Sequence, residues 1–242
     1  MQASKPSVAA GGGGRATFAL HAVAALACLC ALNWLVATKV PLHIQMLETS
    51  YLIFFYHFPS AILCTVFFTI NAVFSVFYLA TQKPSYDLHA RVFAEIGLVA
   101  CCIALATGSV WARMAWGEWW SFGDPRLLWV AIMCLSYAAY VVLQQFMEPG
   151  ERRMRYAAVF AVAAAINVPL VKYAIQFFGE NQHPMEMTSS DSSLKGTQWF
   201  GAFAFLLFYL LVYRWRIAKE KVRASIESSL SAARRIEEGR LA

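Results

Sequence analysis

The chain has 242 residues, of which 60% are hydrophobic, 15% aromatic and only 14% charged, and its formal net charge is +6. Soluble globular domains carry about 25% charged residues, so this composition excludes a water-soluble enzyme, a nucleic-acid-binding domain and a disordered chain. A helix needs about 20 apolar residues to cross the hydrocarbon core of a bilayer, and the chain has room for six such helices. The composition therefore predicts a polytopic membrane protein.

Six uncharged or nearly uncharged runs follow one another along the chain. They cover residues 16–38, 51–80, 92–111, 127–147, 156–178 and 198–213. We interpret each run as a helix, because backbone in contact with lipid must satisfy its own hydrogen bonds. The second run contains His57 and Pro59, and the fifth contains Asn167, Pro169 and Lys172. The expected fold is an all-α integral membrane protein with six transmembrane helices.

Positive charge is distributed unevenly between the two ends of these helices. If the N-terminus is cytoplasmic, fifteen Lys and Arg residues fall on the inner side and four fall on the outer side. Such a bias sets the orientation of membrane proteins, so we expect both termini in the cytoplasm. Three connections then face outwards, over residues 39–50, 112–126 and 179–197.

Three regions are expected along the chain. Residues 1–15, which include four consecutive glycines, form a flexible cytoplasmic extension. Residues 16–217 form the membrane domain, with an outer tryptophan-rich loop at 111–126 and an outer histidine loop at 179–197. Residues 218–242 form a basic cytoplasmic tail that continues the last span as a helix. A basic cluster at 214–223 is expected to face anionic lipid headgroups.

Several kinds of chemistry are excluded by residue position or by missing motifs. All six cysteines lie within the expected spans, which argues against an exposed disulfide or a thiol-redox function. The chain has no C-x-x-C-H motif for covalent haem attachment and no G-x-x-x-x-G-K-[ST] motif for nucleotide hydrolysis. We interpret the cysteines as small packing residues.

Aromatic residues gather in the second outer connection. Four of the eight tryptophans lie within ten residues here, at positions 111, 116, 119 and 120. An aromatic belt at the membrane interface is one interpretation, although one or two rings per helix end suffice for a belt. The other is a platform for a large planar ligand, whose acidic groups could meet Arg113 and Arg126. The number of rings favours the platform.

Two of the five histidines are expected near the same membrane face as the tryptophans. His57 lies some six residues into the second run, about 9 Å deep, where an ionisable side chain indicates a functional site. His183 lies in the third outer connection, close to Met185 and Met187. Two imidazoles suit a low-spin haem iron. A packing role for His57, a solvated position for His183, and His43 or a methionine as ligand remain alternatives.

Several segments of the sequence resemble those of a known protein family. Thr107-Gly108-Ser109, Trp116-Gly117-Glu118-Trp119-Trp120 and Asp124-Pro125-Arg126-Leu127 resemble the tryptophan-rich WWD signature of haem-handling proteins in cytochrome c biogenesis. Residues 51–61 resemble the second span of the haem exporter protein C family. Asn167-Val-Pro169 and the loop with His183 fit the same family. The resemblance covers roughly residues 45–215.

The resemblance implies a haem-handling protein, not an enzyme, in the bacterial cytoplasmic membrane. It implies haem b on the outer face, with His57 and His183 as axial ligands and a platform of Trp116, Trp119 and Trp120. Further haem contacts are expected from Phe122, Asp124 and Arg126. The implied partners are a periplasmic membrane-anchored haem chaperone, ABC-type transporter subunits and a small single-span membrane protein.

The sequence departs from the family pattern W-G-x-W-W-x-W-D at two points. Phe122 replaces a tryptophan, and one additional residue precedes Asp124. Phe122 can still stack on a ligand. The insertion is expected to change the direction in which the Asp124 side chain points. Asp124-Pro125 also resembles the W-D-P pattern of the ligase-type cytochrome c biogenesis system, which is an alternative.

Two further functions fit the sequence less well. A cytochrome b subunit that passes electrons would need histidine pairs near both faces, and the inner face offers only His21 and His89, which are poor candidates. A permease without haem would need a polar path through the spans, for which Glu95, Asn167 and Lys172 are too few. Haem handling on the outer face is therefore the leading hypothesis.

Overall fold

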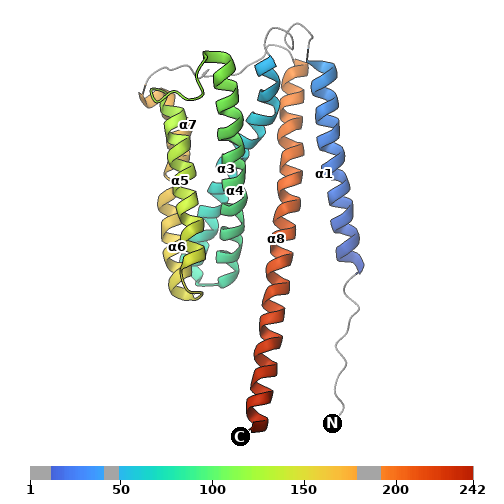
Figure 1. Ribbon diagram of the computed structural model, residues 1–242, viewed down its shortest axis with the longest axis vertical. Helices are drawn as coiled ribbons and strands as arrows, with labels where there is room; N and C mark the ends of the chain where they lie inside the picture. Colours follow the sequence, from blue (N-terminus) through green and yellow to red (C-terminus); the bar gives the residue numbers. More distant parts are fainter. Residues whose placement is uncertain (1–11, 41–48, 179–191, 242) are drawn as a thin grey trace.

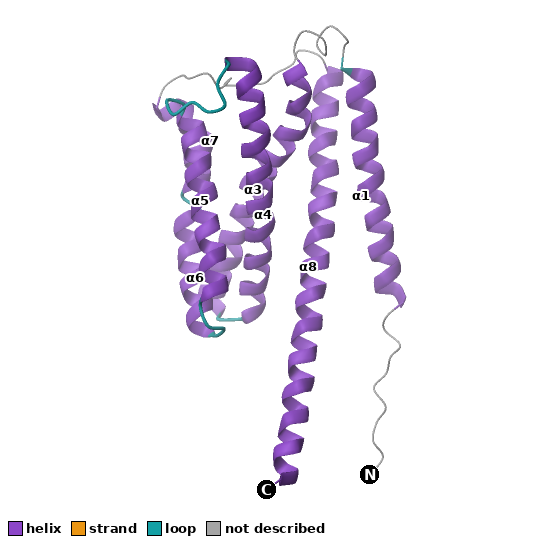
Figure 2. Cartoon of the chain, in the orientation of Figure 1, coloured by secondary structure: helices purple, strands orange, loops and turns teal. Residues whose placement is uncertain are grey.

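The structure, a computed structural model, describes residues 12–40, 49–178 and 192–241. Within these ranges the chain forms helices joined by short connections and contains no strand (Figure 2). The helices are α1 (Gly12–Lys39), α3 (Thr49–Thr81), α4 (Pro84–Trp116), α5 (Pro125–Phe146), α6 (Glu151–Ala164), α7 (Asn167–Phe178) and α8 (Ser192–Leu241). Among the described residues, six stretches are long and apolar enough to cross a membrane, and α6 and α7 together form one of them. The predicted all-α membrane class is confirmed.

The helices run alternately up and down, so that their connections gather at two ends (Figure 1). The connection from α4 to α5, residues 117–124, lies at one end. The start of α1, the end of α8 and the two short turns α3–α4 and α5–α6 lie at the other (Figure 1). The expected helical tail is confirmed, since α8 continues without a break far beyond the bundle. Its residues from Lys221 onwards are exposed where they are described.

Local sequence explains where α4 begins and ends. Pro84 occupies the first turn, where a missing N–H costs nothing. Gly117 ends the helix with φ at +80°, a left-handed conformation that glycine adopts without steric cost, and its N–H donates to the Arg113 carbonyl. The helix therefore extends several residues beyond the expected run of 92–111 at both ends.

The main core is formed by α3, α4, α5 and α6, with contributions from α7 and α8, and depends on a close approach at Gly97. The rings of Phe68 and Tyr137 stack with centroids 3.5 Å apart and planes 10° apart. A Cβ on Gly97 would lie 2.7 Å from Cε1 of Phe68. Phe68 can lie flat against α4 only because position 97 has no side chain.

The fifth expected span, residues 156–178, begins earlier than predicted, at Glu151, and is divided in two. Pro169 has no N–H to donate to the carbonyl of Ala165, so the regular helical hydrogen bonding cannot continue through this point. The side-chain amide of Asn167 donates to the Ala164 carbonyl at 3.1 Å and to Ser136 Oγ at 3.3 Å. These bonds tie the break between α6 and α7 to α5.

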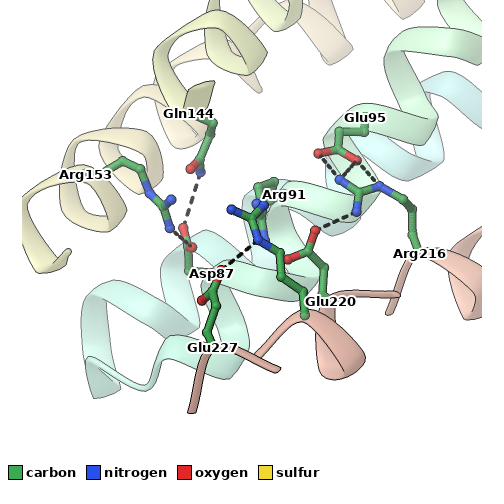
Figure 3. A network of polar contacts seen from close by, with 9 residues as sticks. Asp87, Arg91, Glu95, Gln144, Arg153, Arg216, Glu220 and Glu227 are labelled. Carbon is green, nitrogen blue, oxygen red and sulfur yellow. Dashed lines mark hydrogen bonds and ion pairs between the residues drawn. The ribbon is translucent and has the colours of Figure 1, made fainter. Parts of the chain in front are cut away.

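Ion pairs join α8 to α4 near the end opposite residues 117–124 (Figure 3). Arg216 donates from Nε and Nη2 to the carboxylate of Glu95, at 2.8 and 2.9 Å, and from Nη1 to Glu220 at 2.7 Å. Glu220 also pairs with Arg91 at 3.2 Å. Arg216 thus faces the bundle, not the lipid headgroups that its place in the basic cluster suggested.

A second polar contact joins α4 to α5 and α6 at the same end (Figure 3). The carboxylate of Asp87 is buried and accepts from Arg153 at 3.4 Å and from the Gln144 amide at 3.3 Å. A buried carboxylate needs such partners, because an unpaired charge out of water is costly. The two networks fix the relative positions of α4, α5, α6 and α8.

Candidate functional site

His57 of α3 is held against α4 through one ring nitrogen. Its Nδ1 lies 3.1 Å from the carbonyl oxygen of Ala104 and 3.1 Å from Oγ1 of Thr107. The Thr107 hydroxyl itself donates to the Ile103 carbonyl at 2.7 Å. In the described part of the chain, Nε2 of His57 has no hydrogen-bond partner.

Two glycines let neighbouring helices approach α3 at this level. A Cβ on Gly108 of α4 would lie 3.0 Å from Cε1 of His57, so the imidazole packs directly on the backbone of α4. A Cβ on Gly201 of α8 would lie 3.2 Å from the Phe55 carbonyl and 3.4 Å from Cγ of Pro59. Pro59 lacks the N–H that would bond to Phe55 in a regular helix, and α8 covers this interruption.

His57 lines a cavity of about 310 Å³ between α3, α4 and α5, to which α7 and α8 each add one residue. On α3 the lining runs along one helix face from Phe54 to Thr65, which corresponds to about 17 Å at 1.5 Å per residue. The polar end holds His57, Arg126 and Gln198, and the apolar end holds residues such as Val130 and Met133 of α5. The volume is at the lower end of the roughly 300–1,000 Å³ typical of ligand pockets.

The tryptophan-rich segment borders this cavity through its two ends, Trp111 and Arg126. Trp111, in the last turns of α4, is the tryptophan that lines it. Trp116 packs edge-on against Trp111, with ring centroids 5.0 Å apart and an interplanar angle of 74°. Trp120 packs edge-on against Phe122 at 6.4 Å. Trp119 and Phe122 are 59% and 85% exposed, so their apolar faces are available to a ligand or partner.

Asp124 and Arg126 occupy different positions at the start of α5. The Asp124 side chain is buried and accepts from the backbone N–H groups of Arg126, at 2.9 Å, and Leu127, at 3.2 Å. It is therefore the N-cap of α5, with Pro125 in the first turn, a common arrangement at helix starts. Arg126 is half-buried and lines the cavity.

The structure thus brings together two of the predicted site residues, His57 and Arg126, at one cavity. The predicted residues 116, 119, 120, 122 and 124 do not line it; they belong to the segment between Trp111 and Arg126, both of which do. His183 and the reserve ligands His43, Met185 and Met187 lie outside the described residues, and their roles stay predictions.

The two remaining histidines lie towards the opposite end and are bonded to protein groups. Nε2 of His21 lies 2.9 Å from the Leu207 carbonyl, and Nδ1 accepts from Arg214 at 3.1 Å. Nδ1 of His89 lies 2.7 Å from the hydroxyl of Tyr213. In the described ranges, no group of three or more His, Cys, Asp or Glu side chains could hold a bare metal ion.

The wall that α4 contributes to the cavity was not predicted from the sequence. Ala104, Gly108 and Trp111 all line the cavity at helical spacing, so they share one face of α4. Thr107 and Gly108 belong to the segments that resemble the WWD signature. Nothing in the sequence indicated that they contact His57, about 50 residues earlier in the chain. Helical spacing back from Trp111 is the signal that could have identified this face.

Comparison with known proteins places the chain in a family. Its residues 1–235 match the family model CcmC, described as "Heme exporter protein C". The chain is 29% identical over 181 residues to a protein of that name from Bradyrhizobium diazoefficiens, covering 73% of this chain and 68% of the relative. It is 30% identical over 131 residues to the Paracoccus denitrificans protein, covering 54% of each. A ccmC-like mitochondrial protein of Marchantia polymorpha, named for cytochrome c biosynthesis, is 26% identical over 145 residues, 60% of each chain.

These matched segments span between about half and two thirds of the relatives' own length. The family model itself extends over nearly the whole chain, from the first residue to position 235. The chain belongs to the CcmC, or haem exporter protein C, family.

Proposed function

We propose that this protein binds haem b at the end of the bundle that carries residues 111–126 and presents it to a periplasmic haem chaperone. Family membership supports the broader role, which is haem handling for cytochrome c maturation. The observation that carries the finer proposal is His57, whose Nδ1 is engaged by α4 while its ring lines the cavity. One imidazole supplies one axial ligand, and His183 is proposed as the other.

The chemistry of the cavity fits a porphyrin. The porphyrin provides four ligands to its iron, so the protein needs to add only one or two imidazoles. The apolar walls suit the macrocycle, and Arg126 can form charge-assisted hydrogen bonds with its carboxylates. Trp111 supplies an aromatic surface at the wall, and Trp119 and Phe122 supply exposed rings in the segment between Trp111 and Arg126.

The sidedness of the site follows from the charge bias. Most Lys and Arg residues belong to the end where α1 begins and α8 ends. We place that end in the cytoplasm and the cavity mouth at the periplasmic surface of the bacterial inner membrane. Exposed Trp119 and Phe122 then face an arriving chaperone. ABC-type transporter subunits and a small single-span protein are the further partners proposed.

The opposite end argues against electron transfer across the membrane by a second haem. Both ring nitrogens of His21 contact protein groups, and Nδ1 of His89 contacts Tyr213. A cytochrome b subunit would use such inner histidines as iron ligands. Haem handling at one face is therefore the better supported function.

Absorption spectra of the purified full-length protein test the proposal. The oxidised and dithionite-reduced wild type should give a low-spin b-type spectrum after haem addition. His57→Ala and His183→Ala should each lose haem or become high-spin, because each removes one axial ligand. His89→Ala is the matched control and should keep the wild-type spectrum. A wild type that fails to bind added haem, or a His57→Ala variant with an unchanged spectrum, contradicts the proposal.

A further inference from the structure

The α4 surface behind His57 selects one tautomer of the neutral imidazole. The Ala104 carbonyl can only accept a hydrogen bond, so the Nδ1 atom that contacts it must carry the proton. The Thr107 hydroxyl donates to Ile103, which leaves an oxygen lone pair to accept from the same Nδ1–H. In a neutral imidazole, Nε2 is then unprotonated and carries the free lone pair.

Close packing restricts the ring further. The Gly108 backbone lies under Cε1, the ring carbon between the two nitrogens, where a Cβ would stand 3.0 Å away. A flipped ring would exchange Nδ1 with a carbon and lose both acceptors on α4. The hydrogen bonds therefore set the ring orientation, and the glycine sets how deeply the ring lies against the helix.

We propose that Thr107 and Gly108 are positioning residues that preset His57 as an Nε2 ligand for haem iron. The inference rests on the proposed function, because it assumes that His57 binds iron. Histidines that bind metals commonly donate their other ring N–H to a carbonyl or similar acceptor, which fixes the tautomer and makes the ligand more basic. Here α4 supplies two acceptors for the same proton.

Thr107→Val tests the hydroxyl, since valine keeps the branched shape and removes the acceptor. The Ala104 carbonyl remains, so we expect about 10-fold weaker haem binding, the lower end of the 10–100-fold seen when such partners are removed. A less basic imidazole favours ferric iron less, so the haem reduction potential should rise. Thr107→Ser should restore both properties. Thr69→Val is the matched control, because Thr69 makes the same type of bond to its own helix, to Thr65 at 2.8 Å.

Gly108→Ala tests the close approach independently. The imidazole must move by a few tenths of an ångström, so we expect weaker haem binding and a larger high-spin fraction. Gly196→Ala is its control, since a Cβ there meets no atom of the described residues within 4 Å. Haem binding by Gly108→Ala that equals that of Gly196→Ala overturns the steric part of the inference.

The measurements are titration with haem and a redox titration of the haem-loaded, full-length variants. Weaker binding with a raised potential in Thr107→Val, restored by serine, supports the inference. Wild-type affinity and potential in Thr107→Val overturn it, provided that His57→Ala loses haem. Weaker binding at an unchanged potential also overturns it, because that pattern indicates only a structural role. Full haem retention by His57→Ala instead overturns the proposed function itself.

Discussion

Arg216→Gln should destabilise the protein strongly, because it removes the guanidinium that joins α8 to α4. The side chains of Arg216 and Glu95 are only 20% and 26% exposed, and two nitrogen–oxygen contacts link them. Breaking a buried pair by removing one partner costs about 3–5 kcal/mol, since the other charge is left uncompensated. Because this pair is partly exposed, we expect the lower end of that range, a decrease of about 3 kcal/mol in the free energy of unfolding. Glu220 retains Arg91 as a partner.

The assay is unfolding of the full-length protein in mixed detergent micelles, followed by circular dichroism. The double variant Glu95→Gln/Arg216→Gln should recover much of the lost stability, because two neutral amides replace the unpaired carboxylate. Arg223→Gln is the matched control: Arg223 and its partner Glu227 are 68% and 63% exposed, and such pairs contribute about 0.3–0.5 kcal/mol. Equal losses in Arg216→Gln and Arg223→Gln, or no recovery in the double variant, would refute this reasoning.

Two further predictions concern packing and capping. Gly97→Ala should lower stability by about 1 kcal/mol, because overpacking against Phe68 costs about 1–3 kcal/mol and alanine regains about 1 kcal/mol of helix propensity. Gly196→Ala, where a Cβ meets no described residue within 4 Å, should be neutral or stabilising in the same unfolding assay. Equal behaviour of the two variants would show that Gly97 is not tightly packed. Asp124→Ala should cost about 1 kcal/mol by removing the N-cap of α5, whereas Asp124→Asn keeps an accepting oxygen. If asparagine is as damaging as alanine, the carboxylate has a role other than capping.

Hydropathy alone predicted the number and order of the spans, because each helix must be apolar along its length to cross a membrane. The ends of α4 and the break after α6 were not predicted. They depend on local backbone hydrogen bonds around Gly117 and Asn167, which a count of apolar residues does not register. The pairing of Glu95 was not predicted either, because its partner, Arg216, is 121 residues away in the sequence.

Some residues of the candidate site were also predictable from the sequence, and others were not. His57 stood out as an ionisable residue within an apolar run, and the structure places it at a cavity with Arg126. Asp124 was predicted to contact haem because of its motif, yet its buried carboxylate caps α5. Gly108 was not singled out as a site residue, because it lines the cavity through the contact of α4 with α3, and only its helical spacing from Trp111 indicates that it shares this face.

The most direct test of the central claim is a structure of the haem-loaded protein in lipid nanodiscs. The account predicts iron bonded to Nε2 of His57, with Nδ1 still directed at the Ala104 carbonyl and the porphyrin edge between Trp111 and Arg126. Haem bound away from the cavity between α3, α4 and α5, or iron bonded through Nδ1, would contradict it.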